Sequence, residues 1–167
     1  FPALAKAAEL SGAPAVQNRA TLGGNLASAS GAADLPVPLL VLGALVLACN
    51  SRGERAIPIE NFFTGYRKTV LAKNELLLGV RLPMGDTPVP QAFYKRGSRA
   101  ALTLSRVSIA ASAEVKSGIL RSVRAASGSM TAYPSRMPVT EAFLEGKSLS
   151  GVLIDEAAAC ASEEIVP

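Results

Sequence analysis

A short segment rich in proline and glycine, Met84-Gly85-Asp86-Thr87-Pro88-Val89-Pro90, divides the chain near its midpoint. Proline lacks a backbone N–H and fixes φ, and glycine weakens helices and strands, so regular structure is interrupted there. Beyond the break the apolar pattern changes, because a long alternating stretch typical of a strand begins at Arg106. We therefore expect two units, residues 1–83 and 91–167, joined by a linker over residues 84–90.

Each unit contains patterns of both helices and strands. The sequence predicts helices at residues 2–10, 37–42, 139–144 and 152–164. It predicts strands at residues 44–48, 55–59, 76–82, 106–115 and 120–126. The second helix is expected to begin near Asp34, where Asp can act as an N-cap and Pro36 is tolerated in the first turn. The predicted fold class is α+β, with a small sheet backed by helices in the second unit.

A glycine-rich stretch carries the residues best suited to an anionic ligand. Gly23 and Gly24 remove side-chain atoms from one side of a turn, so that main-chain N–H groups can point at a phosphate. Thr21 and Asn25 flank them with short hydrogen-bonding side chains, and the carboxylate of Asp34 can accept bonds from a ribose hydroxyl or a ring N–H. An ordinary turn is the alternative, because a Gly-Gly pair followed by Asn is common in turns.

Composition excludes several classes of function. The chain has no histidine, so neither a Ser-His-Asp or Cys-His mechanism nor imidazole ligation of a metal is available. Cys49 and Cys160 are too few for a disulfide framework or for a zinc or iron–sulfur ligand set, which favours a cytoplasmic location. The longest apolar stretch, residues 39–49, is about half of the roughly 20 residues that span a bilayer. We expect a bound cofactor to carry any reaction, with no catalytic side chain and no metal ligand from this chain.

Charge is distributed unevenly along the chain, whose net charge is +4. Residues 81–136 are mainly basic, and residues 138–167 are mainly acidic. Aromatic residues are few and no nucleic-acid motif accompanies the basic part, so solvated strand faces are expected there rather than nucleic-acid binding. An anionic cofactor or an acidic partner surface is the alternative explanation for the basic residues.

Blocks along nearly the whole chain resemble the flavin-binding subunit or domain of the xanthine dehydrogenase family of molybdenum hydroxylases, which includes carbon monoxide dehydrogenase. These blocks lie at residues 18–25, 33–40, 51–55, 62–69, 74–77, 93–99 and 105–108. They occur in the family's order, which is more specific than any one block. The resemblance implies the second subdomain of a PCMH-type FAD-binding fold. It also implies that a small antiparallel-sheet-plus-helices domain follows, of the carbon monoxide dehydrogenase flavoprotein C-terminal type.

The resemblance also implies which residues meet the cofactor FAD. They are Thr21, Leu22, Gly23, Gly24 and Asn25 at the pyrophosphate and flavin edge, Asp34, Leu77 near the isoalloxazine, and Lys95 close to the flavin. A cation at Lys95 would stabilise a reduced, anionic flavin and raise its potential. Three of these positions have structural alternatives, with Asp34 as a helix cap, Leu77 as a core strand residue and Lys95 as an exposed charge.

One part of the family's pattern has no counterpart in the 167 residues. The N-terminal subdomain, which supplies a second glycine-rich phosphate loop, is absent, so we expect a fragment that binds FAD weakly or not at all by itself.

The implied function is electron transfer in a molybdenum hydroxylase, from [2Fe-2S] clusters to FAD and then to NAD⁺ or another acceptor. The resemblance assigns the clusters to a small partner subunit and molybdopterin to a large one. Two rival functions stay open. The chain could belong to a stand-alone flavin oxidoreductase, or to a non-catalytic assembly subunit that has lost flavin.

Overall fold

The computed structural model describes residues 1–85, 88–98 and 104–165, which form helices and three antiparallel sheets. The helices are α1 (Pro2–Leu10), α2 (Pro14–Gln17), α3 (Leu22–Ala27), α4 (Pro36–Val41), the 3₁₀ helix η1 (Ile59–Asn61), α5 (Pro138–Leu144) and α6 (Gly151–Glu164). The strands are β1 (Leu45–Asn50), β2 (Gly53–Pro58), β3 (Phe63–Gly65), β4 (Lys68–Thr69), β5 (Leu76–Arg81), β6 (Gln91–Gly97), β7 (Ser105–Lys116), β8 (Ile119–Gly128) and β9 (Ser135–Arg136). This mixture of helices with antiparallel sheets confirms the predicted α+β class.

The predicted elements correspond to α1, α4, α5 and α6 and to β1, β2, β5, β7 and β8, with ends displaced by at most two residues. Helix α2 and strands β3, β4 and β9 are too short for the periodicity of the sequence to indicate them. The predicted linker includes Asp86 and Thr87, which lie outside the described residues.

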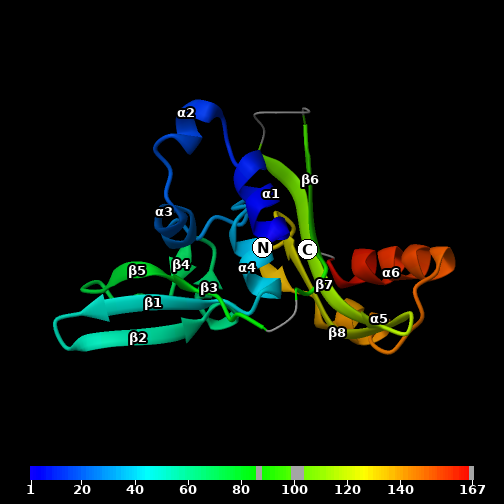
Figure 1. The fold of residues 1–167 in the computed structure, drawn as a ribbon. Coiled ribbons are helices and arrows are strands. Elements are labelled where there is room, and N and C mark those ends of the chain that lie inside the picture. The colour runs from blue at the N-terminus through cyan, green and yellow to red at the C-terminus, as the bar shows by residue number, and fades with distance from the viewer. Residues whose placement is uncertain (86–87, 99–103, 166–167) are drawn as a thin grey trace.

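The sheets have the orders β2-β1-β5, β3-β4 and β6-β7-β8-β9. Figure 1 shows α1 and α4 between the three-stranded sheet and the long strands of the four-stranded sheet. Helix α1 packs against β6, and α4 packs against β7 and β8. On the other side of the long strands, α5 packs against β8 and α6 packs against α5 (Figure 1). The four-stranded sheet therefore lies between two helical layers.

Helix α4 forms the centre of the main core. All six of its residues are buried, and its neighbours in that core include Leu26, Phe62 and Phe93. Full burial of such side chains contributes about 1.5–3 kcal/mol each. The helix begins at Pro36, and no side chain caps it, so the prediction that Asp34 caps this helix was wrong. The side chain of Asp34 has other partners, which hold it inside the protein.

Candidate functional site

The glycine pair lies in a helix and not in a turn. Gly23 and Gly24 are part of α3, and neither has a positive φ. The Oγ1 atom of Thr21 accepts a hydrogen bond of 3.0 Å from the N–H of Gly24, so Thr21 caps α3. The prediction of a glycine turn was therefore wrong, because the cap begins a helix even though two glycines disfavour one. The absence of Cβ atoms still leaves the backbone open to close approach.

Helix α3 places the glycine-rich segment beside β5. A Cβ atom added to Gly23 would lie 3.4 Å from Cδ2 of Leu77, and Leu77 is partly buried against the main core. The structure thus brings the segment Thr21–Asn25 together with Leu77, which are 52 or more positions apart in the sequence. Leu77 packs as a core strand residue and also borders the glycine-rich segment.

Asn25 has an unsatisfied acceptor in this segment. Its Oδ1 atom is buried and has no hydrogen-bond partner among the described residues. A buried polar atom without a partner loses its hydration and gains no hydrogen bond, which costs about 1–3 kcal/mol. The amide of Asn25 is therefore the group in this segment that most needs a donor from a bound molecule.

Asp34 and Lys95 form a second group with Ser105. The Lys95 Nζ donates to Oδ2 of Asp34 at 2.6 Å and to the backbone oxygen of Leu10 at 3.0 Å. The hydroxyl of Ser105 donates to Oδ1 of Asp34 at 2.6 Å. The side chains of Asp34 and Lys95 are each only 6% exposed, so the alternative that Lys95 is an exposed charge is wrong. Both oxygens of the buried carboxylate have partners.

Ser105 was missed as a functional candidate. A weak signal existed, because Ser105, Ser108 and Ser112 interrupt the alternation of β7 at positions that the strand buries. A small hydroxyl at an inward position of a strand indicates a polar partner inside the protein. The sequence could not identify that partner, since Asp34 precedes Ser105 by 71 positions.

The two groups are separate in their polar contacts. Within the described residues no hydrogen bond or ion pair that joins Thr21–Asn25 to Asp34 or Lys95 is found. The predicted site residues therefore fall into an open segment, Thr21–Asn25 with Leu77, and a closed network, Asp34 with Lys95 and Ser105.

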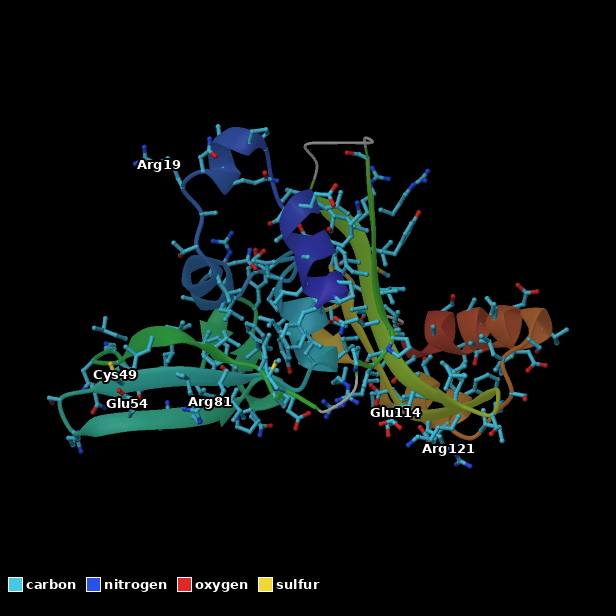
Figure 2. All side chains as sticks on the ribbon, viewed as in Figure 1. Arg19, Cys49, Glu54, Arg81, Glu114 and Arg121 are labelled. Carbon is cyan, nitrogen blue, oxygen red and sulfur yellow. The ribbon has the colours of Figure 1, made fainter. Side chains whose placement is uncertain are left out.

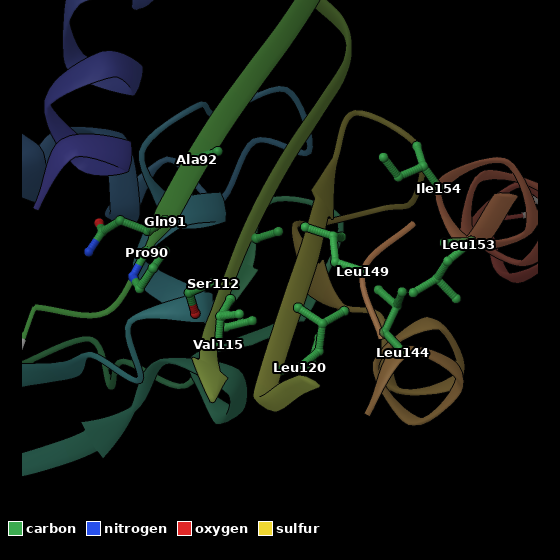
Figure 3. Close-up of a pocket in the computed structure, with 14 residues that line it drawn as sticks. Pro90, Gln91, Ala92, Ser112, Val115, Leu120, Leu144, Leu149, Leu153 and Ile154 are labelled. Carbon is green, nitrogen blue, oxygen red and sulfur yellow. The ribbon is translucent and has the colours of Figure 1, made fainter. Parts of the chain in front are cut away.

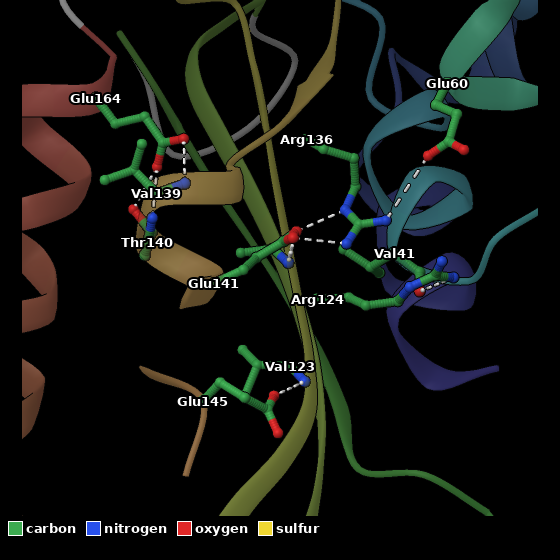
Figure 4. A network of polar contacts seen from close by, with 11 residues as sticks. Val41, Glu60, Val123, Arg124, Arg136, Val139, Thr140, Glu141, Glu145 and Glu164 are labelled. Carbon is green, nitrogen blue, oxygen red and sulfur yellow. Dashed lines mark hydrogen bonds and ion pairs between the residues drawn. The ribbon is translucent and has the colours of Figure 1, made fainter. Parts of the chain in front are cut away.

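A further polar network fixes the helices behind the four-stranded sheet (Figure 4). Arg136 forms two bonds to the carboxylate of Glu141, at 2.5 and 2.7 Å, and also lies 3.9 Å from Glu60. The carboxylate of Glu164 accepts the backbone N–H and the hydroxyl of Thr140, which ties the end of α6 to the start of α5. These acidic side chains are occupied by structural contacts.

A cavity of about 420 Å³ opens between the four-stranded sheet and α6 (Figure 3). Its walls are mainly apolar and include Leu120, Leu153 and Ile154. None of the predicted site residues lines this cavity.

The two cysteines are both free. Figure 2 shows Cys49 on the three-stranded sheet, away from Glu114 and Arg121 on the β7–β8 hairpin, and Cys160 lies in α6. In the part of the chain that the structure describes, no three His, Cys, Asp or Glu side chains are grouped as metal ligands would be. Over the same residues, no helix has the length and apolar character needed to cross a membrane.

Comparison with known families covers both sides of the predicted linker. Residues 1–85 match the FAD binding domain in molybdopterin dehydrogenase. Residues 92–167 match the CO dehydrogenase flavoprotein C-terminal domain. The chain belongs to this family of flavoproteins. The expected resemblance is confirmed, and FAD is the cofactor that goes with the family.

Individual relatives agree with this assignment. The chain is 28% identical to the xanthine dehydrogenase FAD-binding subunit of Escherichia coli O157:H7, over 100% of this chain and 58% of the relative. It is 29% identical to the glyceraldehyde dehydrogenase medium chain of Sulfolobus acidocaldarius, over 91% of this chain and 53% of the relative. The chain thus spans little more than half the length of these curated relatives.

The fold matches a solved structure as well. Carbon monoxide dehydrogenase from Hydrogenophaga pseudoflava superposes with a TM-score of 0.90 at 27% identity, covering 96% of this chain and 55% of that chain. About half of that chain therefore has the arrangement seen in Figure 1.

Proposed function

We propose that this chain is part of the FAD-binding electron-transfer component of a molybdenum hydroxylase of the xanthine dehydrogenase type. In that role it receives electrons from [2Fe-2S] clusters at FAD and passes them to NAD⁺ or another acceptor. The observation that carries the proposal is the match of both halves of the chain, in order, to the two domains of these flavoproteins.

The open segment fits a flavin nucleotide. Gly23 and Gly24 allow a phosphate or ring to approach the backbone, and the unpartnered Oδ1 of Asn25 can accept a hydrogen bond from the ligand. Leu77 borders the segment with an apolar surface suited to the face or edge of a ring system. Thr21 holds the first turn of α3 in place through its bond to Gly24. We assign Thr21, Leu22, Gly23, Gly24, Asn25 and Leu77 to the cofactor side of this segment.

Asp34 and Lys95 belong to the same proposed site as its support. Their opposite charges are paired and buried, so they present a nearly neutral unit and not an isolated cation. A paired ammonium exerts a weaker field at a distance than a free one. FAD supplies the redox chemistry when bound, and the residues of this chain bind it, orient it and exclude water from it.

The proposal includes partners. A large subunit with molybdopterin and a small subunit with the [2Fe-2S] clusters would complete the enzyme, and a reducing cytoplasm suits two free cysteines. Nucleic acid has no place in this function. The division of the chain into residues 1–83, a linker and residues 91–167 is part of the same proposal.

The test is the absorbance spectrum of the whole protein that carries these residues, purified without added cofactor, with chromatography of whatever heat releases. Stoichiometric FAD, together with co-purified subunits that contain molybdenum and iron, is the expected result. FAD without such subunits would favour the stand-alone oxidoreductase. No flavin at all would favour the assembly subunit and overturn the proposal.

A further inference from the structure

Lys95 contacts two points of the chain that flank the cofactor segment. Its Nζ donates to the backbone oxygen of Leu10 at 3.0 Å and to Oδ2 of Asp34 at 2.6 Å. Leu10 is the last residue of α1, and Asp34 lies just before α4. The ammonium therefore caps the C-terminal end of α1 and holds the entry to α4 at the same time.

The residues between these two points, 11–33, contain α2, α3 and the whole segment Thr21–Asn25. Residues 11–25 of this stretch are held weakly by their own packing, whereas Leu26, Ala29 and Ala33 are buried farther along it. No residue of α2 is buried, residues 14–21 are all exposed, and α3 buries only Leu26. Segments with few buried contacts open at low free energy unless their ends are fixed. Lys95, on strand β6, contacts both ends of this stretch.

We propose that Lys95 is a positioning residue, a clasp that holds the two ends of residues 11–33 together and so presents Thr21–Asn25 to the cofactor. Ser105 assists, because its hydroxyl holds the other oxygen of Asp34 at 2.6 Å. In its connection to FAD the inference rests on the proposed function. The clasp acts through geometry, since Asp34 balances the charge of Lys95.

Hydrogen exchange of the whole protein without FAD tests the clasp directly. Lys95→Met should raise amide exchange across residues 11–33 by roughly tenfold or more, and by more there than in the β1–β2 hairpin. Lys116→Met is the matched control, because Lys116 is an exposed lysine paired with Glu114 on the β7–β8 hairpin. It should leave exchange in residues 11–33 as in the wild type.

Lys95→Met alone leaves Asp34 as a buried, unpaired charge, which can unfold the chain generally. The double variant Asp34→Asn with Lys95→Met removes that charge. A clasp predicts that the double variant regains slow exchange in β1 and β2 while residues 11–33 still exchange fast. Slow exchange of residues 11–33 in the double variant would overturn the proposal.

Flavin measurements separate a clasp from a direct contact. The clasp predicts that Lys95→Met weakens FAD binding to the whole protein but leaves the midpoint potential of the bound flavin unchanged. A shifted potential with unchanged exchange in residues 11–33 would mean that the charge acts on the flavin itself, and would overturn the clasp. A wild-type protein that binds no FAD would contradict the proposed function. The exchange experiment would still test whether Lys95 holds the ends of residues 11–33 together.

Discussion

The open segment and the closed network differ in how far this chain satisfies their polar groups. In the closed network, both oxygens of Asp34 have donors and the side chains of Asp34 and Lys95 are 6% exposed. In the open segment, the buried Oδ1 of Asn25 has no partner among the described residues, and Gly24 is exposed. A network that is complete by itself stabilises and positions, whereas an incomplete one is where a ligand gains binding energy. The sequence motif alone did not separate these two roles.

The largest effect is expected in the closed network. Lys95→Met should lower the free energy of unfolding by about 3–5 kcal/mol, because Asp34 is left charged and buried. The double variant with Asp34→Asn should recover most of that loss. Chemical denaturation of the three proteins measures both values. A loss under about 1 kcal/mol for the single variant would mean that the network is not closed to water.

A smaller loss is expected where α4 meets the four-stranded sheet. A Cβ atom on Gly128 would lie 2.6 Å from Oγ of Ser108 and 2.7 Å from Cγ2 of Val37. Gly128→Ala should therefore cost about 1–3 kcal/mol of folding stability through overpacking. Gly79→Ala is the control, because its Cβ would meet no atom within 4 Å. Equal melting temperatures for the two variants would show that Ser108 and Val37 can shift away from the added methyl group at little cost in stability.

The open segment should respond in the opposite sense, with little change in stability and a change in binding. Asn25→Ala removes a buried acceptor that no described residue satisfies, so the free energy of unfolding should not fall below that of the wild type. The dissociation constant of FAD should rise roughly two- to tenfold, the equivalent of one hydrogen bond. Calorimetric titration of the whole protein checks this. A clear loss of stability with unchanged FAD binding would mean that Asn25 stabilises the fold and does not bind FAD.

The smallest effect concerns a surface pair that belongs to neither region. Arg55 forms a two-bond ion pair with Glu75, at 2.7 and 2.8 Å, and lowers the pKa of Glu75 from 4.5 to about 2. A carboxyl with a lowered pKa in the folded state stabilises the protein above its ordinary pKa, and that contribution disappears as the pH falls toward 2.

The stability difference between wild type and Glu75→Gln should therefore be constant at neutral pH and vanish between about pH 4.5 and 2. Denaturation at a series of pH values measures it. A difference that persists at pH 2 would contradict the assigned pKa.

Much of the fold was predictable because local patterns coincide with tertiary packing. The alternation of residues 106–115 indicated the strand β7, although the buried face of β7 carries Ser108, Ala110 and Ser112 and not the more apolar residues. The apolar stretch after Pro36 gave α4, which is buried throughout. The pairing of Lys95 with Asp34 was not predictable, because it joins residues 61 positions apart and depends on how α1 packs against β6. The turn predicted at Gly23-Gly24 was wrong for a related reason, because contacts outside the glycine pair determine its structure. The pair lies in a helix whose first turn Thr21 caps and whose Leu26 is buried in the core, and the glycine pair by itself indicates neither contact.

The central claim is that the open segment receives the flavin while the closed network only positions it. The most direct test compares FAD binding by the whole protein with Gly23→Val and Gly79→Val. A side chain at Gly23 would project toward Leu77 and obstruct the segment, whereas Gly79 faces open space on the same strand as Leu77. The account predicts that Gly23→Val weakens FAD binding on the order of tenfold or more, with Gly79→Val unchanged. Equal, wild-type affinity in both variants would contradict it.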